Sequence, residues 1–191
     1  MIEKVKKLEK EIGSKVRKRL KEFENNKDWF GELCFCILTA NSKAKTALKI
    51  EKEVGNFLNL TEEELKEVIK KNKHRFHNRK ARYIIEARKF KDIKKFLGED
   101  KREWLVKNVK GLGMKESSHF LRNIGFFDYA ILDRHVLNVM KEEGIIEDSK
   151  LNKKRYLEIE EKFKKISEKL GMSMGELDLY VWYMKTGEVL K

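Results

Sequence analysis

A short glycine-containing segment, followed by a lysine and later by an aspartate, holds the residues with the clearest chemical potential in this chain. Gly111 and Gly113 lie between two helical patterns, Lys115 follows two residues later, and Asp133 lies one helix further along. The glycines predict a tight hairpin whose backbone amides, with the N-terminus of the next helix, can approach a phosphate closely. A neutral lysine amine is a nucleophile, and a carboxylate can accept its proton. The pattern indicates a DNA backbone held beside a nucleophile, as base-excision chemistry requires.

The charge of the chain favours a polyanionic partner. Its 191 residues include 45 Lys and Arg against 32 Asp and Glu, which gives a net charge of +13 and a pI near 9.5. Such an excess suits nucleic acid. Because charged residues make up 40% of the chain, a merely charge-rich, solvated surface explains the same numbers, and composition alone leaves both readings open.

The periodicity of apolar residues predicts an all-α fold of about ten helices joined by short loops. Thr61 with Glu64, and Ser173 with Glu176, carry the capping-box signature of a helix start. The expected helices cover residues 2–23, 29–40, 61–71, 78–90, 114–123, 156–170 and 173–185, with another around Trp104 that enters the hairpin and one that opens at Asp133.

Neither the cysteines nor the histidines predict a metal site. Cys34 and Cys36 lie in an apolar run, and with one residue between them they point to different sides of a helix. This spacing argues against a disulfide and favours buried, reduced thiols. The four histidines have no metal-ligand spacing. We expect no metal and no cofactor.

Two further features bear on location. No apolar stretch approaches the roughly twenty residues that span a bilayer, and the charged, periodic N-terminus differs from a signal peptide. The usage of Lys and Glu without Pro resembles that of thermophiles. We expect a prokaryotic, cytoplasmic protein associated with the nucleoid, with no membrane contact.

Longer segments carry a family resemblance. The stretch VKGLGMKESSHFLRNIG, followed by ILDRHV, resembles the helix-hairpin-helix and Gly/Pro-Asp core of the HhH-GPD DNA glycosylases. Within that superfamily the chain is most similar to the compact archaeal-type 8-oxoguanine DNA glycosylase/AP lyases, the second Ogg family. The segments CFCILTANSKAK, RFHNRKARYI and LDLYVWYMKTGEVLK support this resemblance, which covers the chain from about Trp29 to its end.

The resemblance implies a two-lobed helical enzyme with its active site in the cleft between the lobes. The central lobe would cover residues 29–131, including the helix-hairpin-helix at about 101–124, and the second lobe residues 1–28 plus 132–191. The four-cysteine loop of endonuclease III relatives is missing, so no iron–sulfur cluster is expected. The implied partner is double-stranded DNA containing oxidised guanine, bound by a monomer that needs no protein partner.

Lys115 is the expected nucleophile, which would form a Schiff base at the sugar C1′. Asp133 would stabilise the cationic sugar and help to deprotonate the amine, and the same side chain could also cap a helix. The hairpin would contact DNA through Gly111, Gly113 and Lys110.

The resemblance assigns further roles to residues outside the hairpin. Asn41 would fill the gap left by an extruded base, while Arg75 and Phe76 would contact the estranged base, with Phe76 as a wedge. The residues expected at the extruded base itself are Lys191, Trp182 and His119. Without the resemblance, Asn41 is equally well a helix cap, and Phe76, Trp182 and His119 are equally well packing residues.

Two other functions compete with a bifunctional 8-oxoguanine glycosylase/AP lyase. One is an endonuclease III-type enzyme for oxidised pyrimidines, which the missing cluster cysteines argue against. The other is a non-catalytic hairpin module that holds DNA for a partner. That module would need Gly111 and Gly113 but neither Lys115 nor Asp133, so the joint presence of all four favours an enzyme.

The resemblance also gives the carboxylate of Lys191 a role that can be tested. The N7 of 8-oxoguanine carries a hydrogen, whereas the N7 of guanine is an acceptor, so a group that only accepts hydrogen bonds favours the lesion. We therefore expect deletion of Lys191, or a tag added after it, to lower excision of 8-oxoguanine far more than cleavage of an abasic site. Rates measured on the two DNA substrates check this. If both activities are retained equally, the carboxylate is not the group that recognises 8-oxoguanine.

Overall fold

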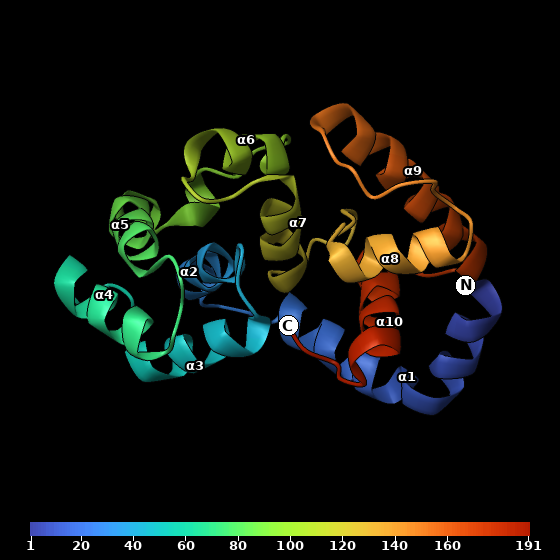
Figure 1. Ribbon diagram of the computed structural model, residues 1–191, viewed down its shortest axis with the longest axis horizontal. Coiled ribbons are helices and arrows are strands. Elements are labelled where there is room, and N and C mark those ends of the chain that lie inside the picture. The colour runs from blue at the N-terminus through green and yellow to red at the C-terminus, as the bar shows by residue number, and fades with distance from the viewer. The chain divides into compact units, whose positions relative to one another are not determined.

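The computed structural model describes residues 1–191 as ten α-helices and two short 3-10 helices, with no strand (Figure 1). The prediction of an all-α fold is confirmed. None of the helices combines the length and the apolar character needed to cross a membrane. The elements are α1 (Ile2–Glu24), α2 (Trp29–Thr39), α3 (Ala44–Val54), α4 (Glu62–Lys71), α5 (His77–Ala87), η1 (Arg88–Phe90), η2 (Ile93–Lys95), α6 (Lys101–Asn108), α7 (Met114–Asn123), α8 (Arg134–Glu142), α9 (Lys153–Leu170) and α10 (Met174–Thr186).

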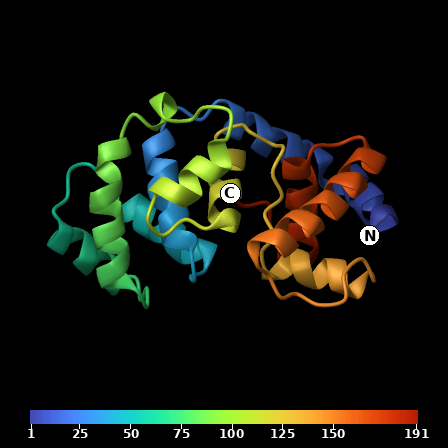
Figure 2. The ribbon, with the colours of Figure 1, turned by 90° about the horizontal axis from the view of Figure 1, so that it is seen from above.

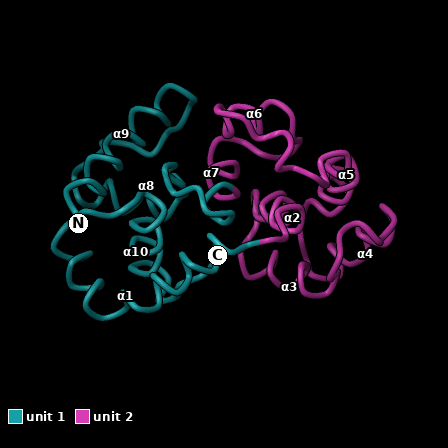
Figure 3. Tube along the Cα trace, turned by 180° about the vertical axis from the view of Figure 1, so that it is seen from behind, with its two compact units in different colours: residues 1–26, 121–191 teal, residues 27–120 magenta.

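The helices belong to two compact units, coloured separately in Figure 3. Unit 1 consists of residues 1–26 and 121–191 and contains α1, α8, α9 and α10. Unit 2 consists of residues 27–120 and contains α2 to α6 with both 3-10 helices. Helix α7 begins in unit 2, and its last three residues belong to unit 1.

Helix α2 is the core of unit 2. Its residues are mostly apolar, and every residue from Phe30 to Thr39 is buried, including Glu32. Its first turn is fixed by the carboxylate of Asp28, which accepts a hydrogen bond from the amide of Gly31 at 2.8 Å. Cys34 and Cys36 are fully buried on this helix and form no disulfide. Burial raises the pKa of the Cys34 thiol well above its usual value.

Helix α10 is the core of unit 1, where it packs against α1, α8 and α9 (Figure 1 and Figure 2). Its side chains from Leu177 to Val181 are buried. Among them, Asp178 forms an ion pair with Arg122 at the end of α7. Burial raises the pKa of the Asp178 carboxyl, and the Arg122 guanidinium opposes that rise. Because both side chains are 95% buried, loss of either partner would leave a desolvated charge inside unit 1.

The structure differs from the predicted helices in two places. Helix α3 was not predicted, because its N-cap is Lys43, which provides no side-chain capping bond, and only Ala47 and Ile50 of its residues are buried. The helix expected over 78–90 ends at Ala87, and the chain continues as the 3-10 helix η1. Tightening of the last turn is a common end for an α-helix.

Candidate active site

The predicted hairpin lies between α6 and α7 in unit 2. Gly111 has a φ of +91°, and a Cβ atom placed on it would lie 2.7 Å from the Tyr83 ring, so this turn requires glycine. Gly113 has no positive φ, and a Cβ atom there would meet only a Glu116 oxygen at 3.3 Å. Two apolar side chains of the turn, Val109 and Leu112, are buried and anchor it.

Lys110 and Lys115 lie on the two sides of this turn and differ in their surroundings. Lys110 is exposed, and its Nζ lies 2.8 Å from a Glu86 carboxylate oxygen on α5. Lys115 lies in the first turn of α7 with its side chain 32% exposed, and its Nζ lies 3.0 Å from Glu116 Oε1. The Glu116 carboxylate is thus an ion-pair partner and a nearby proton acceptor for the candidate nucleophile. Glu116 was not predicted from the sequence.

A second lysine near Lys115 was also missed. Lys80 on α5 is only 3% exposed, and its Nζ donates a hydrogen bond to the Ile37 carbonyl at 2.6 Å. Burial lowers the pKa of Lys80 to about 8; Glu116 opposes this shift, and the positive charge of Lys115 adds to it. Its spacing was the available signal, because Lys80 lies four residues before Ile84, which is buried on the same helix.

His119 lies one helical turn after Lys115 and is half-buried. Its ring contacts the Phe35 ring of α2 edge-on, with centroids 5.8 Å apart and an interplanar angle of 76°. This contact holds the imidazole against α2.

The residues predicted to probe the duplex lie on two short connections of unit 2. Asn41, between α2 and α3, is exposed and has a φ of +60°; the caps of these helices are Ala40 and Lys43, so Asn41 caps neither. Phe76 at the start of α5 is half-buried and outside the core. The Arg75 guanidinium lies 4.4 Å from the centroid of the Phe76 ring.

Asp133 belongs to unit 1, where it is the N-cap of α8. Its Oδ1 accepts a hydrogen bond from the Val136 amide at 2.8 Å, and the residue is half-buried. The capping role predicted for this side chain is confirmed. The bond occupies one carboxylate oxygen and fixes the direction of the other.

The remaining predicted residues, Trp182 and Lys191, also lie in unit 1 and are half-buried. The Trp182 ring contacts His135 edge-on with centroids 4.9 Å apart. Its indole Nε1–H is buried without a hydrogen-bond partner, which is uncommon for a buried donor. Lys191 follows the end of α10 at Thr186.

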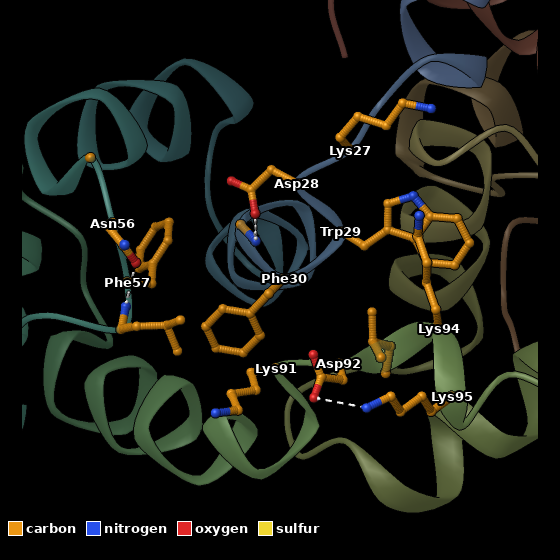
Figure 4. Close-up of a pocket in the computed structure, with 14 residues that line it drawn as sticks. Lys27, Asp28, Trp29, Phe30, Asn56, Phe57, Lys91, Asp92, Lys94 and Lys95 are labelled. Carbon is orange, nitrogen blue, oxygen red and sulfur yellow. Dashed lines mark hydrogen bonds and ion pairs between the residues drawn. The ribbon is translucent and has the colours of Figure 1, made fainter.

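A separate pocket of about 570 Å³ lies beside the N-terminus of α2 in unit 2 (Figure 4). It is lined by lysines and aromatic side chains, and Lys94 Nζ lies 4.4 Å from the centroid of the Trp29 ring. None of the predicted site residues lines this pocket. The structure contains no group of three or more His, Cys, Asp or Glu side chains arranged to hold a metal ion.

Comparison with known proteins identifies the fold and then the family. The structure resembles that of endonuclease III in a non-covalent complex with DNA, with a TM-score of 0.64 at 19% identity over 96% of this chain and 89% of that one. At this identity the likeness shows a shared fold, that of the helix-hairpin-helix glycosylases. A family model described as 8-oxoguanine DNA glycosylase matches residues 16–172.

Relatives at higher identity match along the whole chain. The 8-oxoguanine DNA glycosylase/AP lyases of Methanocaldococcus jannaschii and Aquifex aeolicus are 45% and 40% identical, over 100% of this chain and 99% of each relative. The crystal structure of the M. jannaschii glycosylase/lyase with a 15mer DNA containing 8-oxoguanine has a TM-score of 0.95 at 46% identity, covering 100% of this chain and 99% of that one. The chain belongs to the 8-oxoguanine DNA glycosylase family.

The geometry of Gly111 yields a stability prediction. Gly111→Ala forces a positive φ on an L-residue and brings its Cβ against the Tyr83 ring, so we expect it to lower the free energy of unfolding by about 1–3 kcal/mol. Denaturant titration measures this. Gly98→Ala is the matched control, because a Cβ atom there meets nothing within 4 Å. Equal midpoints for the two variants would contradict the argument.

Proposed function

We propose that this protein excises 8-oxoguanine from double-stranded DNA and cleaves the backbone at the resulting abasic site by β-elimination. The observation that carries the proposal is Lys115, a partly exposed amine in the first helical turn after a glycine hairpin, in a chain of this family. The names of the full-length relatives, 8-oxoguanine DNA glycosylase/AP lyase, support both activities.

Binding to the DNA backbone would depend on the hairpin and on the charge of the chain. The turn at Gly111 and the N-terminus of α7 offer backbone amides to a phosphate. Exposed Lys110 adds a positive charge beside the turn, although its pairing with Glu86 must loosen to reach a phosphate. The net charge of +13 favours contact with any duplex, so this part of the affinity is independent of the lesion.

In the proposed chemistry the neutral amine of Lys115 attacks the sugar C1′, and the bond from C1′ to the base breaks. The base leaves with its electron pair and takes up a proton, and opening of the sugar ring gives a Schiff base on Lys115. Loss of a proton from C2′ then expels the 3′ phosphate. Glu116 Oε1, 3.0 Å from the Lys115 Nζ, is positioned to accept the proton that the ammonium must lose before attack.

Asp133 would stabilise the positive charge that develops on the sugar as the base leaves. Its capping bond to the Val136 amide supports this role, because a carboxylate held through Oδ1 has little freedom to turn away. We assign the same carboxylate the assistance of amine deprotonation. Capping and catalysis are compatible in one side chain, since capping uses only one of its two oxygens.

The extruded base would be recognised by His119, Trp182 and Lys191, and the gap in the duplex filled by Asn41. Trp182 is half-buried, and its ring would stack on the extruded base. Asn41 is exposed at a turn, and Phe76 carries the Arg75 guanidinium on its ring face, an arrangement suited to stacking against an estranged base.

The proposed partner is duplex DNA with an oxidised guanine, bound by a monomer. Because its substrate would be chromosomal and its relatives come from prokaryotes such as M. jannaschii and A. aeolicus, we place the protein in the prokaryotic cytoplasm at the nucleoid.

Lys115→Gln tests the nucleophile. Borohydride should trap the native protein covalently on duplex DNA containing 8-oxoguanine, and the variant should give no trapped complex and no cleavage while still binding the duplex. Gel analysis of the trapped complex measures this. Lys107→Gln, an exposed lysine on α6, is the matched control and should trap normally. Trapping that persists in Lys115→Gln would assign the Schiff base to another amine.

Asp133→Asn tests the carboxylate without removing the cap, because asparagine caps helices as well as aspartate does. We expect unchanged thermal stability and an excision rate lowered on the order of 100-fold. Single-turnover rates and a melting curve give the two values. Asp133→Ala is the comparison variant and should lose stability as well as rate. A near-native rate for Asp133→Asn would reduce Asp133 to a helix cap.

A further inference from the structure

Two of the carbonyls at the buried C-terminus of α2 are satisfied by side chains from a distant part of unit 2. The last four carbonyls of an α-helix have no partner within the helix and, when buried, need donors from elsewhere. Here all four accept a hydrogen bond. Their donors are Thr39 Oγ1 to Cys36 O at 2.9 Å, Lys80 Nζ to Ile37 O at 2.6 Å, His74 Nε2 to Leu38 O at 2.9 Å, and the Ser42 amide to Thr39 O at 3.0 Å.

The His74 imidazole connects two segments through its two ring nitrogens. Its Nε2 bonds to the Leu38 carbonyl, which can only accept, so Nε2 carries the hydrogen. Its Nδ1 then accepts a hydrogen bond from the Phe76 amide at 3.2 Å. His74 is 2% exposed, and burial lowers its pKa, which favours the neutral form that this pair of bonds requires.

Each of these two segments contains a non-glycine residue with an unusual backbone conformation. Asn41 and Lys73 are the two residues other than glycine with a positive φ, at +60° and +58°. Lys73 ends α4 in a Schellman motif, in which the His74 amide bonds to the Ile69 carbonyl at 3.2 Å and the Lys73 amide to Lys70 at 2.8 Å. That turn directs the His74 side chain into the core. Unfavourable backbone conformations persist only where surrounding contacts fix them, and they concentrate at functional sites.

Lys80 of α5 adds a second hydrogen bond to the C-terminus of α2. Its ammonium is buried, and it bonds to the α2 terminus rather than to solvent. A positive charge at the C-terminus of a helix interacts favourably with the helix dipole. Because burying an ammonium is costly, its presence here indicates that the position of the α2 terminus matters.

We propose that His74 and Lys80 are positioning residues that hold the Asn41 turn and the Arg75–Phe76 segment in one register, so that filling the gap and contacting the estranged base occur together. This inference rests on the proposed function, in which those segments contact the duplex. It concerns neither the nucleophile nor the recognition of the extruded base.

A double-mutant cycle tests whether His74 acts through Asn41. Asn41→Gly removes the side chain while allowing the positive φ, and His74→Phe removes both imidazole bonds. We expect each to slow single-turnover excision of 8-oxoguanine from a duplex by about tenfold, and the double variant to be little slower than either alone. If the two factors multiply, the residues act independently and the proposal is wrong.

Cleavage of an abasic site in single-stranded DNA separates this proposal from the proposed function. That substrate needs the Lys115 amine but has no opposite strand, so His74→Phe should stay within about twofold of the native rate. A loss equal to that on the duplex would make His74 a general structural support and overturn the proposal. If the native protein excises nothing, the proposed function fails instead.

Amide hydrogen exchange tests the coupling without DNA. Lys80→Met, which leaves the His74 bonds in place, should speed exchange at Phe76 as well as in the turn at residues 40–43, with other α5 amides unchanged. Lys52→Met, an exposed lysine on α3, is the matched control and should change neither segment. Faster exchange confined to the turn would show that the two segments are not coupled, and this measurement stands even if His74→Phe fails to fold.

Discussion

Helix α2 is buried to its last residue, and the need for hydrogen-bond donors to its C-terminal carbonyls organises unit 2. The C-terminal residues of α2 are buried, so their carbonyls need donors supplied by the protein. This requirement explains why a histidine and a lysine lie in the core of a chain whose other basic residues are mostly on its surface. It also means that the exposed Asn41 turn is built on a fully bonded support. The mobility expected of a surface loop is therefore restricted where the duplex would be probed.

Unit 1 also buries polar side chains, and it satisfies them by pairing opposite charges. Its buried charges are opposite in sign and adjacent, since Arg122 at the end of α7 pairs with Asp178 of α10. Arg122 also donates to Asn123 Oδ1, at 3.0 Å from Nε and 2.9 Å from Nη2. These bonds fix the end of α7 within unit 1, and the hairpin fixes the beginning of the same helix within unit 2. The candidate nucleophile thus lies on a helix whose two ends are held by independent networks.

The sequence predicted the helices whose apolar residues recur regularly and whose starts carry capping residues, such as those at Thr61 and Ser173. Helix α3 lacks both signals. Lys115 and Asp133 were predicted because hairpin, amine and carboxylate follow each other at short spacings, and their catalytic roles stay predictions. Lys80 and His74 could not be identified in this way, because their significance depends on the α2 carbonyls opposite them, and only tertiary structure brings those groups together. Glu116 directly follows Lys115, but the sequence does not show that its side chain turns toward the amine.

The two cysteines of α2 have a consequence for the conditions under which the protein works. Oxidants attack the thiolate form of cysteine, and they need access to it. Cys34 and Cys36 are both 0% exposed, and the raised pKa of Cys34 keeps its sulfur protonated. A repair enzyme for oxidised guanine is needed most when peroxides and radicals are abundant. By burying Cys34 and Cys36 in the centre of unit 2, this chain protects both thiols from the agents that create its proposed substrate.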